Sequence, residues 1–147
     1  MTTEELLKEL RTVLAGRSDL RFAVLFGSAG TRGPDWARDI DVAVSCSIPL
    51  ALLDRARLAT ELEVALGRVV DVVDVEEAST LLRWEVVRHG RTILANDPEH
   101  LLQFKARVPI ERADLEPYYA RESAGLRRAL EEPRWYASNS SVTRSGD

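Results

Sequence analysis

The sequence predicts an α/β fold in which a small mixed β-sheet is flanked by helices and followed by a helical C-terminal segment. Short apolar runs rich in β-branched residues alternate with longer segments in which leucines recur every three or four positions. The 147 residues are 45% hydrophobic and 30% charged, which is the composition of a folded protein. A chain of this length has room for one core, so we expect a single domain over residues 1–132.

The N-terminal half predicts two helices and two strands. The first helix carries an apolar stripe of Leu6, Leu7, Leu10, Val13 and Leu14. The apolar run 21–26 predicts a buried strand that stops at Gly27. Residues 39–45 (DIDVAVS) alternate strictly between polar and apolar faces, which predicts a second strand. A second amphipathic helix follows and ends at Gly67, a residue type that favours helix C-termini.

The next segment predicts two more strands around a helix. Residues 69–75 (VVDVVDV) are rich in β-branched residues and predict the third strand. Ser79 is a suitable N-cap for the helix that follows, and residues 91–95 predict an edge strand.

The pattern from Pro98 onward is helical. Because proline cannot donate a backbone hydrogen bond, we expect Pro109 and Pro117 to break or kink this helix. The polar, serine-rich residues 133–147 predict a disordered tail.

Composition and charge exclude several classes of protein. The net charge is −4 and the pI about 5.3, so we expect no stable binding to nucleic acid. Cys46 is the only cysteine, which excludes an internal disulfide and indicates a reducing compartment. No signal peptide and no membrane-spanning apolar run is expected, so the cytoplasm is the expected location.

Acidic residues recur on the predicted strands. Asp39 and Asp41 are two positions apart and therefore point to the same face of their strand. The third strand offers Asp71 and Asp74, which are three apart and face opposite sides. Asp71 and its rival Asp74 are both candidates for the third member of one acidic site.

Such a group of carboxylates indicates a divalent cation. Like charges a few ångströms apart repel one another, and a cation reverses that penalty. Mg²⁺ prefers oxygen ligands and commonly combines carboxylates with the phosphates of a substrate. Two ions roughly 3.5 to 4 Å apart can promote an in-line displacement at phosphorus, and Asp71 is also a candidate acceptor for the hydroxyl proton.

Gly27 and Ser28 follow the first predicted strand directly. Glycine allows a phosphate to approach the backbone closely, and the serine hydroxyl with the free N–H groups of a following helical turn can satisfy its oxygens. Gly-Ser alone is a weak signal, which gains weight from the acids that follow.

Together these residues resemble a known signature. Gly27-Ser28, ten further residues and then D-I-D from Asp39 to Asp41 resemble the motif of the DNA polymerase beta nucleotidyltransferase superfamily. The segment VVDVVDV is similar to the one that provides the third acid of that family, and this resemblance together with strand alternation favours Asp71 over Asp74. The small size, the RWEVVRHGRTIL run and the helical C-terminal part resemble the minimal nucleotidyltransferases, or MNT proteins. The resemblance covers roughly residues 22–130 and implies a polymerase beta-like fold.

The resemblance also implies an activity and a partner. MNT proteins of this type are often antitoxins of HEPN/MNT pairs, which implies transfer of AMP from ATP to a tyrosine hydroxyl of a HEPN ribonuclease toxin within a hetero-oligomer. By the same resemblance, Gly27 and Ser28 would bind the triphosphate. Asp39 and Asp41 would bind both Mg²⁺ ions, and Asp71 would bind the catalytic one.

Three nearby residues extend or depart from the pattern. Arg32 is a candidate to steady a phosphate or the acceptor. The family often has serine directly before D-x-D, where this chain has Arg38, and Trp36 lies in a loop that is usually polar.

Two alternative functions stay open at the level of sequence. One is nucleotidyl transfer to a small hydroxylated molecule such as an aminoglycoside. The chain is short for this function, because drug-modifying relatives usually add a substrate-binding domain. The other is a non-catalytic antitoxin that inhibits its partner by occlusion.

Overall fold

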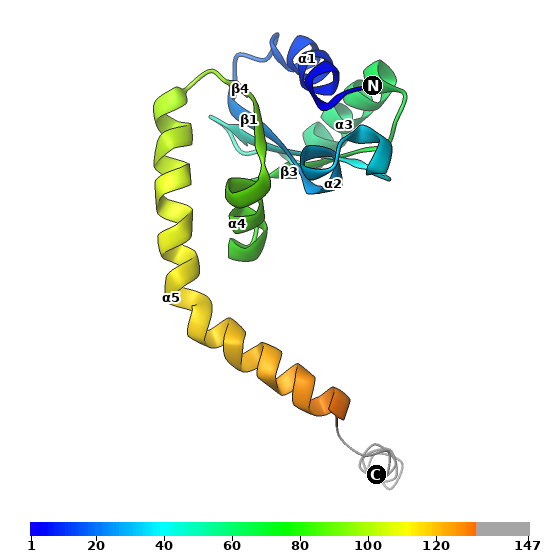
Figure 1. The fold of residues 1–147 in the computed structure, drawn as a ribbon. Coiled ribbons are helices and arrows are strands. Elements are labelled where there is room, and N and C mark those ends of the chain that lie inside the picture. The colour runs from blue at the N-terminus through cyan, green and yellow to red at the C-terminus, as the bar shows by residue number, and fades with distance from the viewer. Residues whose placement is uncertain (132–147) are drawn as a thin grey trace, which may run out of the picture. The chain divides into compact units, whose positions relative to one another are not determined.

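The computed structural model describes residues 1–131, in which four strands form one mixed sheet (Figure 1). The strands are β1 (Leu20–Phe26), β2 (Ile40–Cys46), β3 (Val70–Asp74) and β4 (Arg91–Ala95). Their order is β3-β2-β1-β4, with β1 antiparallel to β2 and β4, and β2 parallel to β3. The predicted α/β class with a small mixed sheet is confirmed, and β4 is an edge strand as expected.

Five helices and one 3₁₀ turn connect and cover these strands. They are α1 (Thr3–Leu14), α2 (Gly27–Thr31), the 3₁₀ turn η1 (Pro34–Trp36), α3 (Leu52–Leu66), α4 (Thr80–His89) and α5 (Pro98–Glu131). Local sequence explains several of their ends. Thr2 and Glu5 form a capping box at the start of α1, and the Ser79 side chain accepts a hydrogen bond from the Leu82 N–H at the start of α4. Gly67 ends α3 in the left-handed conformation.

Helices cover both faces of the sheet (Figure 1). One apolar layer joins α1 and α3 to the face that bears Ile40, Val42 and Val44 of β2. A second layer joins α4 and the first part of α5 to the opposite face, where Ala43 lies. Because side chains alternate along a strand, Asp41 belongs to the α4–α5 face. The layers therefore determine on which side of the sheet the predicted site can open.

The contacts divide the chain into two compact units, Met1–Arg112 and Ala113–Asp147. The first unit contains the whole sheet and the first part of α5. The second is described as far as Glu131, where α5 ends. The expected single domain over residues 1–132 stays a prediction, and the expected disordered tail, 133–147, lies outside the described residues.

Helix α5 continues through Pro109 and Pro117, so neither proline breaks the helix, and the alternative, a kink at either proline, stays a prediction. Each proline removes one helical hydrogen bond. At Pro109 the apolar contacts of α5 offset this loss, because Phe104 and Val108 are fully buried in the core against the sheet. Among the described residues, no helix is long and apolar enough to cross a membrane.

Candidate active site

The register of the sheet brings two of the predicted acids together. Strands β2 and β3 run parallel, and Asp41 is the register partner of Asp71. Neighbouring strands are about 4.8 Å apart, so these two carboxylates start from adjacent backbone positions on the same face. Asp71 is exposed and Asp41 is partly buried.

Gly27 lies against the Asp41 side chain. Phe26 at the end of β1 pairs with Asp41, so the chain leaves the sheet directly beside this acid. Gly27 has a φ of 68°, and a Cβ built there would overlap Oδ2 of Asp41. Both the backbone conformation and the contact with Asp41 therefore require glycine at this position.

Asp39 lies just before β2 and is exposed. Its charge nevertheless reaches Asp41. Burial raises the pKa of Asp41 above its ordinary value, and the negative charges of Asp71 and then Asp39 raise it further. The structure thus brings all three predicted acids into one negative field centred on Asp41.

The ligand chemistry of these acids suits a hard divalent cation. Asp39, Asp41 and Asp71 provide only oxygen ligands, which Mg²⁺ prefers. A cation among them would reverse the repulsion that raises the pKa of Asp41. Within residues 1–131, no group of three or more His, Cys, Asp or Glu side chains is already arranged so that it could hold a metal ion. The suitability of these residues for Mg²⁺ therefore rests on their oxygen donor atoms and on the repulsion between their charges.

The rival acid, Asp74, has a different environment. It is 5% exposed and accepts hydrogen bonds from the Leu50 N–H at 3.3 Å and the Glu76 N–H at 3.0 Å. These bonds connect the end of β3 to the segment before α3 and to the turn before α4. Asp74 therefore has a structural role on the opposite side of the strand from Asp71.

The two remaining predicted residues belong to α2. Ser28 is exposed in the first turn of this helix, directly after Gly27. Arg32 caps its C-terminus and lines a hollow with Trp36 and the N-terminal residues 1–3. Ser28 thus adjoins the acidic centre, which consists of Asp39, Asp41 and Asp71, through Gly27. Arg32 lies one helical turn further along the chain.

Arg68 lies near the site and was not predicted from the sequence as a site residue. It precedes β3, and its guanidinium donates hydrogen bonds to the backbone carbonyls of Pro34, at 2.7 Å, and of Ala37. These carbonyls are more than 30 residues away in sequence, so no local pattern could have revealed the contact.

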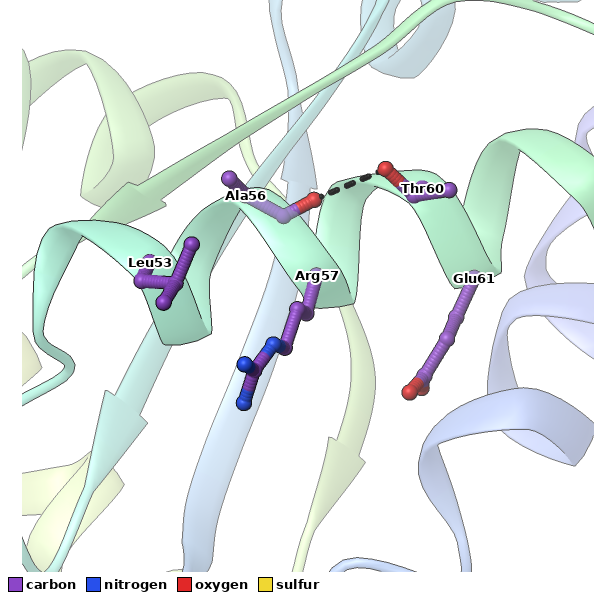
Figure 2. A pocket seen from close by; sticks show the side chains of 5 residues that line it. All are labelled: Leu53, Ala56, Arg57, Thr60 and Glu61. Carbon is purple, nitrogen blue, oxygen red and sulfur yellow. Dashed lines mark hydrogen bonds between the residues drawn. The ribbon is translucent and has the colours of Figure 1, made fainter.

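A separate apolar pocket lies along α3, as Figure 2 shows. Its lining residues come from one helix and are Leu53, Ala56, Arg57, Thr60 and Glu61. Leu58 and Leu62 of the same helix pack on the sheet face opposite Ala43 and Asp41. The pocket is therefore on the other side of the sheet from the acidic centre.

Comparison with known proteins agrees with this arrangement. Residues 8–99 match the family model described as polymerase beta, nucleotidyltransferase. A stretch of 74 residues is 38% identical to the protein adenylyltransferase MntA of Shewanella oneidensis and covers 50% of this chain. It spans 53% of that relative, which is about half of its length.

Two solved structures extend the similarity over most of the chain. One chain of a toxin–antitoxin crystal structure with AMP-PNP superimposes with a TM-score of 0.68 at 28% identity, covering 84% of this chain and 98% of that one. A chain from the complex of tri-AMPylated Shewanella oneidensis HEPN toxin with MNT antitoxin gives a TM-score of 0.67 at 26% identity, covering 87% and 98%. Since the family model matches more than half of the residues and the structures share the fold, this chain belongs to the polymerase beta nucleotidyltransferase family.

Proposed function

We propose that this protein is an antitoxin that transfers AMP from ATP to a tyrosine hydroxyl of a HEPN-type toxin and so inactivates it. The reaction would take place within a hetero-oligomer of the two proteins in the cytoplasm, with Mg²⁺ as cofactor. The observation that carries this proposal is the position of Asp41, which lies against Gly27, is the register partner of Asp71 and is within the field of Asp39.

Each predicted residue has a role in this reaction. Gly27 and Ser28 would accept the triphosphate beside Asp41, because glycine leaves the backbone open to a phosphate. Asp39, Asp41 and Asp71 would hold Mg²⁺, which would neutralise charge on the triphosphate and activate the acceptor hydroxyl.

The transfer itself is a displacement at phosphorus. The tyrosine oxygen forms a bond to the α-phosphorus of ATP, the bond between the α-phosphorus and the bridging oxygen breaks, and pyrophosphate leaves. The exposed carboxylate of Asp71 is the proposed acceptor of the hydroxyl proton. Arg32 would steady a phosphate or the acceptor. Such a reaction depends mainly on positioning and charge neutralisation, which these side chains provide.

The similar proteins support the choice of nucleotide and acceptor. The curated relative is a protein adenylyltransferase, one solved neighbour contains AMP-PNP and another contains an AMPylated HEPN toxin. ATP and a HEPN-type partner are therefore the substrates that we propose here.

The decisive experiment is intact mass spectrometry of a HEPN-type partner co-expressed with this protein. We expect one or more additions of about 329 Da, the mass that each transferred AMP contributes. Purified protein, ATP, Mg²⁺ and unmodified partner should reproduce the same additions. An unmodified partner under both conditions would contradict the proposal.

The matched control replaces two carboxylates by amides of the same shape, Asp39→Asn with Asp41→Asn. The double variant should still bind the partner but should add no AMP and should not neutralise toxicity. If it neutralises the toxin fully, the protein acts by occlusion and the proposed catalytic function is wrong.

A further inference from the structure

The three acids of the site are held by different parts of the fold. Asp41 and Asp71 lie within paired strands, so the hydrogen bonds of the sheet fix their backbone positions. Asp39 precedes the first residue of β2 and is exposed. On its C-terminal side Asp39 joins Ile40, whose N–H donates a 2.9 Å hydrogen bond to the Val69 carbonyl. On its N-terminal side its position depends on the loop of residues 33–38 that leads into the strand.

Contacts within this loop shape it but do not attach it to the sheet. Gly33 has a φ of 101°, and the Trp36 and Ala37 N–H groups each donate a 3.2 Å bond to the carbonyls of Gly33 and Pro34. These are the short-range bonds of a 3₁₀ turn. They do not determine where the turn lies relative to β3.

Two features attach the loop to the rest of the unit: Ala37 is buried in the apolar core, and Arg68 binds the turn through hydrogen bonds. The Arg68 Nη1 donates to the Pro34 carbonyl at 2.7 Å and its Nη2 donates to the Ala37 carbonyl, so one guanidinium binds both ends of the turn. The backbone of Arg68 lies between the end of α3 and the start of β3, three residues before Asp71. A planar group with several fixed donors is suited to bridging two carbonyls, which the single ammonium of lysine is not.

We propose that Arg68 is a positioning residue of the active site, which sets the place of Asp39 relative to Asp71 by fastening the 33–38 loop to the start of β3. This inference rests on the proposed function, because an effect of Arg68 on catalysis requires that the protein transfers AMP. Arg68 acts through backbone carbonyls and not through direct contact with substrate. Errors of about 1 Å in such a site can reduce turnover about 100-fold.

The test compares Arg68→Met and Arg68→Lys with the wild type and with Arg57→Met as control. Methionine keeps an unbranched side chain but removes every donor, whereas lysine keeps the charge and can reach one carbonyl. Arg57 lies on α3, its side chain is 69% exposed and its nearest carboxylate, that of Asp54, is 3.9 Å away. All measurements are made at a temperature at which circular dichroism shows each variant to be folded.

Two readouts are independent of catalysis. Hydrogen exchange of the Trp36 and Ala37 amides should become faster in Arg68→Met. Binding of Mn²⁺ in the presence of AMP-PNP, followed by electron paramagnetic resonance, should weaken about tenfold, as is typical when a group that orients a metal ligand is lost. Arg68→Lys should give intermediate values, and Arg57→Met should behave as the wild type.

Kinetics with the toxin partner provide the third readout. In Arg68→Met, kcat for AMP transfer should fall about 10- to 100-fold while KM for the partner changes little, because the acceptor surface is intact. If Arg68→Met binds Mn²⁺ and turns over as the wild type does, Arg68 is only a structural residue and the inference is overturned. If Arg68→Met does not fold, the same comparison is made with Arg68→Lys, and wild-type Mn²⁺ affinity and kcat in that variant overturn the inference.

The two proposals fail in distinguishable ways. If the wild type transfers no AMP to a HEPN-type partner, the proposed function is wrong, but Mn²⁺ binding and hydrogen exchange still decide the role of Arg68. If the wild type is active and the Arg68 variants are unchanged in all three readouts, only the positioning role is wrong.

Discussion

Asp41 lies partly buried between Gly27 and Asp71, and its charge is therefore costly to the folded state. Burial is the largest cause of its raised pKa, followed by the charges of Asp71 and Asp39. A carboxyl group with a raised pKa binds its proton more tightly in the folded than in the unfolded protein. Folding stability is therefore lost as the pH rises above about 3.8, the ordinary value, through the folded-state pKa.

Asp41→Asn should consequently stabilise the metal-free protein near neutral pH. The amide keeps the shape of the side chain and removes the charge, so we expect the Tm to rise by a few degrees, since about 1 kcal/mol corresponds to roughly 2 to 8 °C in domains of this size range. The gain should disappear below the ordinary pKa of aspartate, where both states of the wild type are protonated. Thermal unfolding in EDTA across the acidic and neutral range measures both effects, and a lower Tm near neutral pH would contradict the assignment.

Mg²⁺ with AMP-PNP provides the complementary measurement. Ligands that bind only the folded state raise its stability, so the wild type should gain Tm when both are added. The Tm of Asp41→Asn should rise much less, because this variant lacks one of the proposed metal ligands. The same residue would then limit stability in the absence of the cofactor and contribute to stability in its presence.

At the scale of elements, a single glycine determines the end of α3. Gly67 ends α3 with a φ of 68°, and no atom lies within 4 Å of the place where a Cβ would be. Gly16 follows α1 and also has open space around it, but it is absent from the glycines with positive φ. The two positions differ mainly in backbone conformation, which makes them a matched pair.

Gly67→Ala should therefore destabilise the protein by about 1 kcal/mol, the cost of a left-handed conformation for a residue with a Cβ. Gly16→Ala should be neutral or slightly stabilising, because alanine reduces the freedom of the unfolded chain. Urea unfolding of both variants at constant pH tests the difference. Equal effects at the two sites would show that the conformation at Gly67 does not explain its occurrence.

The elements could be predicted from sequence because their signals are local. The strands follow from runs and alternation such as residues 39–45, and the helix ends from Ser79 and Gly67. Alternation together with the family resemblance also favoured Asp71 over Asp74, and the structure places Asp71 beside Asp41. These features require no knowledge of which distant segments meet.

Contacts between distant side chains and backbone could not be predicted in this way. Arg68 bonds to carbonyls 34 and 31 positions away, and the sequence pattern around it is that of an ordinary connection between helix and strand. The continuity of α5 across Pro109 depends in the same way on burial against the sheet, which is absent from the local signal of a proline. Tertiary contacts decided both features.

At the scale of the whole first unit, a polar network connects α5 to the sheet beside the apolar core. Glu76 Oε1 accepts a hydrogen bond from the Ser45 hydroxyl on β2 at 2.8 Å and lies 2.8 Å from Nε2 of His100 on α5. Arg107 of α5 is 3.8 Å from the other carboxylate oxygen. Burial alone would raise the pKa of Glu76, but the hydrogen bonds of His100 and Ser45 and the charges of His100 and Arg107 outweigh it and lower the pKa.

A carboxyl group with a lowered pKa affects stability in the opposite direction to Asp41. Its contribution is fully present above about 4.5, the ordinary value, and is lost as the pH falls through the folded-state pKa. Glu76→Gln should therefore destabilise the protein near neutral pH by about 1 kcal/mol, a value reduced because the side chain is partly exposed. The difference from the wild type should shrink in acid, where the wild-type carboxyl group also loses its charge.

The matched control is Glu77→Gln, which changes an exposed glutamate next in the chain. Urea unfolding as a function of pH should give wild-type behaviour for Glu77→Gln and a loss confined to neutral pH for Glu76→Gln. Asp41→Asn in the same series should show a gain in stability in that range.

Because the network lies between β2 and α5 while Asp41 lies at the other end of β2, the two effects should add in the double variant Asp41→Asn with Glu76→Gln. Failure of additivity would mean that α5 and the acidic centre are energetically coupled through β2.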